Sequence, residues 1–305
     1  MNHRVKITIL GCGSAKPTKE HTPSSQMVEM CSKSFLVDAG EGTQINMQRI
    51  AVKQARMDNI FISHLHGDHC FGLIGLISTL GMLGRTRSLT IHAHADLEKL
   101  LRPMLDYFCK GMAYEVNFHH IDPYKKEVIY DDRTMTVTSL PLKHRVPCCG
   151  FLFSEKQRPP HIIPQMFERY NIPLAMIPAI KDGEDYLTAD GQLIPNQQLT
   201  RPSSAPISYA YCSDTAYSER LAEWVRGVDC LYHEATYMQE HLAHAKKNMH
   251  STAIEAATIA KKAGVGQLLI GHYSSRIKDE QQLLAEAKQV FENTRLTYEG
   301  MVVEI

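Results

Sequence analysis

The stretch Ser63-His64-Leu65-His66-Gly67-Asp68-His69 decides how this sequence is interpreted. It places three imidazoles and a carboxylate within six residues, directly after an apolar run that is typical of a buried strand. Such side chains cost free energy when they are buried without partners, and a divalent cation satisfies all of them together. The glycine allows the tight backbone turn that the cluster needs. Nitrogen and carboxylate ligands favour Zn²⁺, with Mn²⁺ or Fe²⁺ as alternatives.

On both sides of this stretch, short apolar runs alternate with helical patterns, which predicts an α/β layered domain. The expected strands cover residues 5–10, 34–37, 59–63, 89–92, 134–140, 209–213, 228–232 and 267–270. Helices are expected near residues 218–226 and over residues 280–291. Thr252 and Glu255 match a capping box at the start of another helix, which Gly264 is placed to end.

Three further ligand-type residues follow expected strands. They are His144, Asp214 and His272. In layered α/β folds, functional groups gather where strands end and loops begin. We therefore expect these three side chains to join residues 64–69 in one metal site.

The motifs of this chain resemble those of the ribonuclease Z family, within the metallo-β-lactamase superfamily. The resemblance covers nearly the full length and rests on Leu10-Gly11-Cys12-Gly13-Ser14, Asp38-Ala39-Gly40-Glu41-Gly42-Thr43-Gln44, residues 64–69, Leu142-Lys143-His144, Ser213-Asp214-Thr215, His233-Glu234-Ala235-Thr236, His250-Ser251-Thr252 and Gly271-His272-Tyr273-Ser274-Ser275-Arg276. The histidine-rich run alone indicates only the superfamily. The stretches that begin at His233 and His250 are far more specific to ribonuclease Z.

The resemblance implies a four-layer αβ/βα sandwich, with two mixed β-sheets flanked by helices, that forms a single domain over residues 1–305. It also implies two Zn²⁺ ions, one held by His64, His66 and His144, the other by Asp68, His69 and His272, with Asp214 bridging both. Two such cations, two carboxylates and a bridging hydroxide keep one net positive charge, which suits a phosphodiester substrate.

The implied reaction is hydrolytic removal of the 3′ trailer from precursor tRNA, which leaves a 3′-hydroxyl on the tRNA. The family pattern suggests His250 as the proton donor, oriented by Glu234, and Asp68 as a residue that shares a proton with the attacking water. The positive end of the following helix makes a protonated His250 a stronger acid, and Glu234 counters that effect. From the residues alone, His250 is equally well explained as a packed residue at a helix start.

Residues 154–204 differ from the rest because they contain seven of the chain's 14 prolines. Such a stretch predicts either a mobile functional arm or a small irregular subdomain. The resemblance implies an inserted tRNA-binding arm, although its usual glycine-proline pair is absent here. The residues expected to contact RNA are Lys156, Arg158, Arg169 and Lys181 in this segment, with Lys19 and Arg276 outside it.

Composition limits the remaining alternatives. The chain has 305 residues, 44% of them hydrophobic, and its 33 basic and 33 acidic side chains cancel, so any RNA-binding footprint must be local. No apolar run reaches the ~18 residues of a membrane span. Eight scattered cysteines without a Cys-x-x-Cys pair indicate reduced thiols and a cytoplasmic protein.

The resemblance implies a homodimer, with precursor tRNA as partner and neither DNA nor a membrane. Two other functions remain open at this point. One is a phosphodiesterase of the same superfamily that acts on small cyclic or artificial diesters. The other is a non-catalytic RNA-binding protein whose metals are structural, although structural zinc sites are usually closed and four-coordinate.

Overall fold

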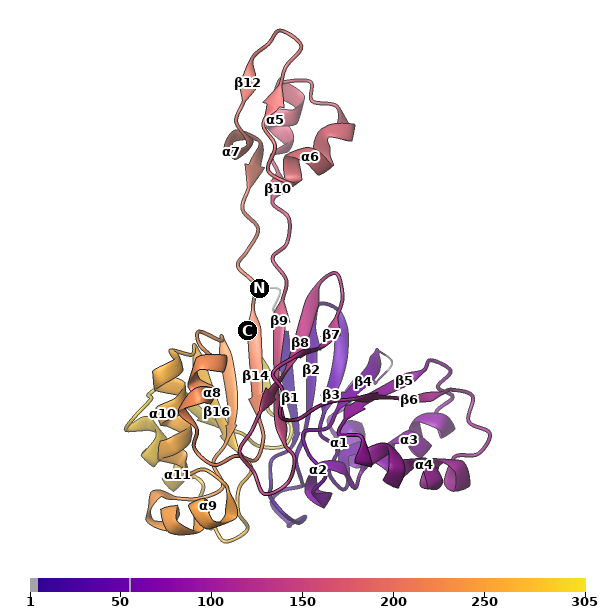
Figure 1. The fold of residues 1–305 in the computed structure, drawn as a ribbon, viewed down its shortest axis with the longest axis vertical. Coiled ribbons are helices and arrows are strands. Elements are labelled where there is room, and N and C mark those ends of the chain that lie inside the picture. Colours follow the sequence, from indigo (N-terminus) through magenta and orange to yellow (C-terminus); the bar gives the residue numbers. More distant parts are fainter. Residues whose placement is uncertain (1–4, 55) are drawn as a thin grey trace. The chain divides into compact units, whose positions relative to one another are not determined.

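The computed structural model describes residues 5–54 and 56–305, which divide into two compact units. The larger unit contains the described residues up to Ser154 together with Ile207–Ile305, and the smaller unit is Glu155–Pro206. Two seven-stranded sheets, with helices beside them, build the larger unit (Figure 1). In the part of the chain that the structure describes, no helix is both long and apolar enough to cross a membrane.

The first sheet has the strand order β18-β1-β2-β3-β4-β5-β6. Its strands are β1 (Val5–Gly11), β2 (Ser25–Met30), β3 (Lys33–Val37), β4 (Met57–Phe61), β5 (Leu89–Ala93), β6 (Val116–His120) and β18 (Val302–Glu304). Strands β3 to β6 run parallel, and the remaining pairs are antiparallel. Apolar side chains of this sheet pack against α1 (Thr43–Arg49), α3 (Leu73–Met82) and α4 (Asp96–Phe108) in one buried cluster.

The second sheet has the order β17-β16-β15-β14-β9-β8-β7. Its strands are β7 (Val128–Asp131), β8 (Met135–Pro141), β9 (Cys149–Glu155), β14 (Ser208–Cys212), β15 (Cys230–Glu234), β16 (Gln267–Gly271) and β17 (Thr294–Leu296). Strands β14 to β17 are parallel, so their carboxyl ends lie at one edge. The helices that pack beside it are α8 (Glu219–Trp224), α10 (Ala253–Ala263) and α11 (Gln281–Lys288).

Aromatic side chains from both sheets fill the space between them. The ring centroids of Phe35 and Phe153 are 5.6 Å apart, and those of Phe61 and Phe151 are 5.3 Å apart. Buried aromatic pairs of this kind contribute more than their buried area alone. The expected sandwich of two mixed sheets between helical layers is thus confirmed.

Most expected elements are present, and the differences have local causes. The capping box is formed, since Thr252 accepts from the Glu255 amide, and Gly264 ends α10 in a left-handed conformation. The strand expected at residues 228–232 begins two residues later, because the Val228 amide donates back to the Val225 carbonyl in a turn. That shift places Glu234 at the end of a strand. Helix α11 is shorter than expected at both ends.

The unit Glu155–Pro206 contains short elements around a small apolar core. Strand β10 (His161–Ile162) pairs with β13 (Thr200–Arg201), and β11 (Tyr186–Leu187) pairs with β12 (Leu193–Ile194). Its helices are α5 (Pro164–Arg169), η1 (Leu174–Met176), α6 (Ile177–Lys181) and α7 (Asn196–Leu199). The core residues are Phe167, Ile172, Ile180, Ile194 and Leu199. A core of this size supports only a few kcal/mol of stability.

Candidate metal centre

The seven candidate ligands come from the carboxyl ends of strands in both sheets. The loop after β4 supplies His64 and His66, and the short helix α2 (Gly67–Cys70) supplies Asp68 and His69. His144 follows β8, Asp214 follows β14 and His272 follows β16. The structure therefore brings together all seven residues that the sequence pointed to.

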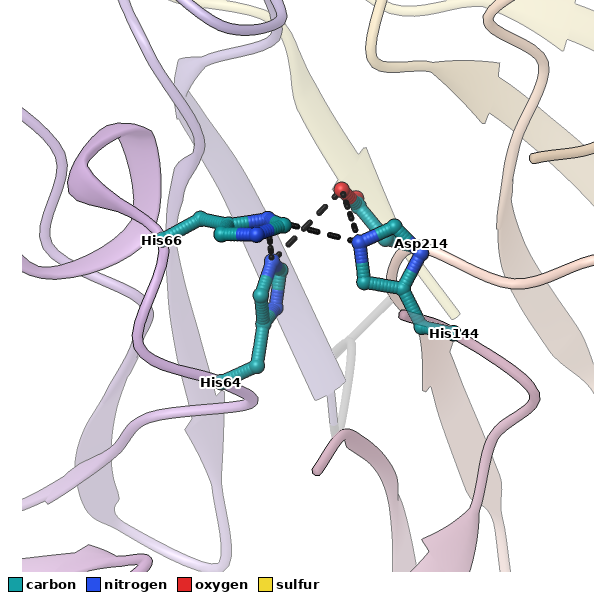
Figure 2. Close-up of side chains that lie close together, drawn as sticks. All are labelled: His64, His66, His144 and Asp214. Carbon is teal, nitrogen blue, oxygen red and sulfur yellow. Dashed lines mark hydrogen bonds and ion pairs between the residues drawn. The ribbon is translucent and has the colours of Figure 1, made fainter. Parts of the chain in front are cut away.

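The first group consists of His64, His66, His144 and one oxygen of Asp214 (Figure 2). The Nδ1 atom of His66 lies 3.1 Å from Nε2 of His64 and 3.3 Å from Nε2 of His144. Oδ2 of Asp214 lies 3.5 Å from Nε2 of His64 and 3.7 Å from Nε2 of His144. Three ring nitrogens and a carboxylate oxygen thus surround one point.

The second group consists of Asp68, His69 and His272, with the other oxygen of Asp214. The Nε2 atoms of His69 and His272 are 3.3 Å apart, and Oδ2 of Asp68 lies 3.6 Å and 3.4 Å from them, respectively. Oδ1 of Asp214 lies 3.4 Å from Nε2 of His69 and 3.2 Å from Nε2 of His272. Each Asp214 oxygen therefore faces a different histidine group.

These donor atoms fit a divalent metal. Oδ1 of Asp214 is buried and its polar neighbours in the second group are the ring nitrogens of His69 and His272, so a cation that all three atoms bind would satisfy this carboxylate oxygen. Burial raises the pKa of Asp214, but the imidazoles of His272 and His69 outweigh burial and hold that pKa well below its usual range. The carboxylate is therefore charged, and nitrogen and oxygen donors of this kind are typical zinc ligands.

Asp38 is a buried residue of the site whose role the sequence did not reveal. Its Oδ2 accepts from His69 Nδ1 at 2.7 Å and from the Tyr211 hydroxyl at 2.7 Å, and the Ser63 amide donates to its Oδ1 at 2.8 Å. Carboxylates that hold the second nitrogen of a metal-ligating histidine fix its tautomer and orientation. Its φ of 56° lies in the left-handed region, which aspartate and asparagine tolerate better than most residues.

Glu234 and Thr236 link His250 to the second ligand group. Oε1 of Glu234 lies 2.8 Å from Nδ1 of His250, and its Oε2 accepts from the Thr236 hydroxyl at 2.6 Å. The same hydroxyl lies 2.9 Å from Nδ1 of His272. Burial lowers the pKa of His250, but the adjacent Glu234 carboxylate outweighs burial and raises that pKa to about 9. The Glu234 carboxylate therefore favours the protonated form of His250.

The segment after helix α9 (Leu242–Asn248) serves both His144 and His250. Nδ1 of His144 lies 2.9 Å from the Met249 carbonyl oxygen, which fixes Nε2 toward the first group. Met249 has a left-handed φ of 59°, and His250 is the next residue. Nothing in the sequence pattern signals this contact, because it joins residues 105 positions apart.

The expected RNA-contacting residues fall on both units. Lys19 and Arg276 are exposed in the larger unit, and Arg276 borders a cavity of about 260 Å³ that Thr236 also lines. In the smaller unit, the Arg158 guanidinium pairs with Glu155, and the Arg169 guanidinium lies 5.4 Å from the Tyr170 ring centroid. Lys156 and Lys181 are partly exposed.

The chain is similar in sequence to ribonuclease Z proteins over almost its entire length. It is 53% identical over 302 residues to "Ribonuclease Z" of Phocaeicola vulgatus, covering 99% of this chain and 98% of that relative. It is 50% identical over 299 residues to "Ribonuclease Z" of Porphyromonas gingivalis, covering 98% of both chains. A family model described as "Anti-Pycsar protein Apyc1" matches residues 5–158, which include residues 64–69 and His144 but not Asp214, His250 or His272.

Two solved structures share the fold. Human tRNase Z, short form, is 23% identical, covers 98% of both chains and has a TM-score of 0.71. The metallo-β-lactamase fold protein YhfI from Bacillus subtilis is 21% identical, covers 99% of both chains and has a TM-score of 0.68. From the full-length relatives, this chain belongs to the ribonuclease Z family, and its residues 5–158 also belong to the family that the Apyc1 model describes.

Proposed function

We propose that this chain is a metal-dependent endoribonuclease that removes the 3′ trailer from precursor tRNA and leaves a 3′-hydroxyl on the tRNA. The observation that carries the proposal is the Asp214 carboxylate, whose two oxygens face two separate groups of histidines in a member of the ribonuclease Z family. Family membership argues against a non-catalytic RNA-binding protein.

In this proposal the site holds two Zn²⁺ ions, with His64, His66 and His144 around one, Asp68, His69 and His272 around the other, and Asp214 between them. The chemistry that such a pair supplies is polarisation of the scissile phosphate and activation of water near neutral pH. The two oxygens of Asp214 are evidence for two ions rather than one. Each oxygen has its own set of imidazole nitrogens 3.2–3.7 Å away.

His250 is the proposed proton donor to the leaving oxygen, and Glu234 is its positioning residue. Oε1 of Glu234, 2.8 Å from Nδ1 of His250, would hold the proton on that nitrogen, and in this proposal Nε2 would donate the proton to the leaving group. A general acid must be protonated before the reaction, and the raised pKa of His250 meets that condition. Asp68 is proposed to share a proton with the attacking water, since its Oδ2 belongs to the second group and accepts from the Ala15 amide at 2.6 Å.

The unit Glu155–Pro206 is proposed to be an arm that binds tRNA. Arg169 and Lys181 are the last residues of α5 and α6, respectively, so both sit at helix ends. Together with Lys156, Arg158, Lys19 and Arg276 they would neutralise backbone phosphates, which position RNA without reading its sequence. A local footprint of this kind is compatible with a net charge of zero.

A homodimer is also proposed, with its contact at one end of the helical layer beside the first sheet. Helices α3 and α4 connect parallel strands, so they run in the same direction and end at the same side of the sheet. Met82 is 83% exposed and Tyr107 is 79% exposed, and Leu83 and Phe108 beside them are exposed too. Exposed apolar groups of this kind mark association surfaces. Met82→Glu is expected to convert a dimer into a monomer in sedimentation experiments.

The chain is proposed to act in the cytoplasm. The thiols of Cys109, Cys149, Cys212 and Cys230 lie buried among apolar side chains in the two main cores of the larger unit. Free buried thiols of this kind are typical of a reducing compartment.

The experiment that tests the function is incubation of the full chain with a precursor tRNA that bears a 3′ trailer. We expect one cut, after the discriminator nucleotide, with a 3′-hydroxyl on the tRNA, and no cut in the presence of a chelator. A precursor that stays intact while a small artificial diester is hydrolysed would instead support the second candidate, a phosphodiesterase for small diesters. Residues 5–158 also match a second family model, described as "Anti-Pycsar protein Apyc1", so ribonuclease Z is not the one family that this part of the chain resembles.

A further inference from the structure

A second cluster of ligand-type side chains lies outside the metal centre. It joins Cys12, which follows β1, His21, in the loop of residues 13–22, and Glu299, between β17 and β18. The Cys12 Sγ atom lies 3.5 Å from Nδ1 of His21, which lies 3.0 Å from Oε2 of Glu299. The three ligand atoms are all within 4.8 Å of one another.

We propose that Cys12, His21 and Glu299 form a separate binding site for one thiophilic divalent cation, Zn²⁺. Tetrahedral zinc, with bonds of about 2.3 Å to sulfur and about 2.1 Å to nitrogen, holds those two atoms roughly 3.6 Å apart. The Sγ to Nδ1 distance in this cluster is 3.5 Å. Cys12 and His21 are therefore already spaced as two ligands of one ion, and Oε2 of Glu299 lies close enough to be a third.

The second nitrogen of His21 supports the assignment. Its Nε2 lies 3.2 Å from Oε1 of Glu280, so a carboxylate can hold the proton there and leave the Nδ1 lone pair free for a metal. The alternative is an imidazolium that donates to Glu280 and Glu299. In that arrangement Nδ1 of His21 carries a proton and cannot accept from the Cys12 thiol, although Sγ lies only 3.5 Å from it, and the thiol must turn to oxygen acceptors such as the Thr297 carbonyl, 3.6 Å away.

Burial and access also fit a cation. Cys12 is fully buried, so a thiolate there requires a compensating positive charge. One Zn²⁺ balances the charges of the Cys12 thiolate and the Glu299 carboxylate, while His21 stays neutral. A cavity of about 520 Å³, lined in part by His21, Tyr273 and Glu280, gives an ion a path from the surface.

A cation in this site would fasten the loop of residues 13–22 to the C-terminal part of the chain. The Thr22 amide already donates to Oε1 of Glu299 at 2.9 Å. The same loop carries Ala15, whose amide donates to Asp68 Oδ2 at 2.6 Å. The proposed ion would thus hold a segment that touches the metal centre, but its existence does not depend on the proposed RNA substrate.

Cobalt substitution tests the site directly, because the ligands proposed for the metal centre offer only nitrogen and oxygen atoms. Among the described residues, Cys12 alone of the cysteines belongs to a cluster of three ligand-type side chains. We expect the Co²⁺-loaded full chain to show a sulfur-to-cobalt charge-transfer absorption in the near ultraviolet. Cys12→Ser should abolish that absorption and lower the bound Zn²⁺ by one ion per chain. The matched control Cys109→Ser, at a buried thiol beyond α4, should change neither.

Glu299→Gln serves as a second variant, since it keeps the thiol and nearly the same shape. It should weaken cobalt binding and shift the concentration at which the charge-transfer absorption appears to higher values. The proposal is overturned if the parent chain shows no such absorption, or if Cys12→Ser retains both the absorption and the full ion count. Neither readout uses RNA, so failure here is distinct from failure of the proposed nuclease activity.

Discussion

The metal-centre edge of the larger unit and the unit Glu155–Pro206 are built in contrasting ways. At the edge, side chains from both seven-stranded sheets converge, and buried partners such as Asp38 and Thr236 hold the rings. The smaller unit has strands of two residues, a core of five buried side chains and basic groups at helix ends. Catalytic groups must be held within about 0.5 Å, whereas phosphate contacts need mainly charge within reach. This difference in required precision explains why the proposed catalytic groups are positioned by the two large sheets, whereas the proposed phosphate-binding groups of the arm are not.

The largest expected effect is at Asp214, where one residue serves both ligand groups. Asp214→Asn keeps the shape but removes the charge shared by the two groups. We expect bound metal to fall and kcat/KM for precursor tRNA to drop by about 1,000-fold or more. Metal analysis and cleavage kinetics measure both quantities. Asp106→Asn, at an exposed position on α4, is the control and should match the parent. Full activity in Asp214→Asn would end the two-ion proposal.

The next effect concerns the proposed proton donor. His250→Ala should lower kcat by about 100- to 10,000-fold, because a general acid is lost, while metal content stays unchanged. His241→Ala changes an exposed histidine nearby and should leave kcat as it is. An unchanged rate in His250→Ala, with the same metal content as the parent, would remove His250 from the mechanism.

A smaller effect is expected at Asp38, which contacts the candidate ligand His69. Asp38→Asn retains a residue that tolerates the left-handed φ, but it no longer offers His69 a charged acceptor. We expect metal affinity to weaken by about 10- to 100-fold, measured by titration with a competing chelator. Activity should return when excess Zn²⁺ is added. Loss of activity that added metal does not restore would assign Asp38 to folding rather than to the site.

The smallest effect is expected in the arm. Arg169→Glu and Lys181→Glu should raise KM for precursor tRNA several-fold and lower the salt dependence of binding by about one unit for each phosphate contact that is lost. Hydrolysis of a small artificial diester should not change, since that substrate offers no further backbone phosphates for the arm to bind. Equal losses of activity toward both substrates would contradict the proposal that the smaller unit acts only in binding tRNA.

The structure brings the seven candidate ligands together as the sequence led us to expect, because their signal is local, and their binding of metal stays a prediction. The run of residues 64–69 is continuous, and His144, Asp214 and His272 each directly follow a predictable strand. The strand before Glu234 was misplaced by two residues, since apolar periodicity does not reveal where a turn ends. The seven candidate ligands could therefore be identified with little knowledge of the tertiary structure.

The residues that hold the ligands could not be predicted in the same way. Asp38 reaches His69 across 31 positions, and Met249 reaches His144 across 105. Such contacts exist only after two sheets have packed together, and no spacing rule encodes them. The short helices inside Glu155–Pro206 were also missed, because elements of four to six residues lack a readable period.

The carbonyl of Met249 has one further consequence. A single peptide segment supports a ring of the first histidine group on one side and carries His250 on the other. A compound that binds beside helix α9 and changes the backbone conformation of Met249 would displace both His144 and His250. An inhibitor that acts on this backbone segment would need no metal-chelating group.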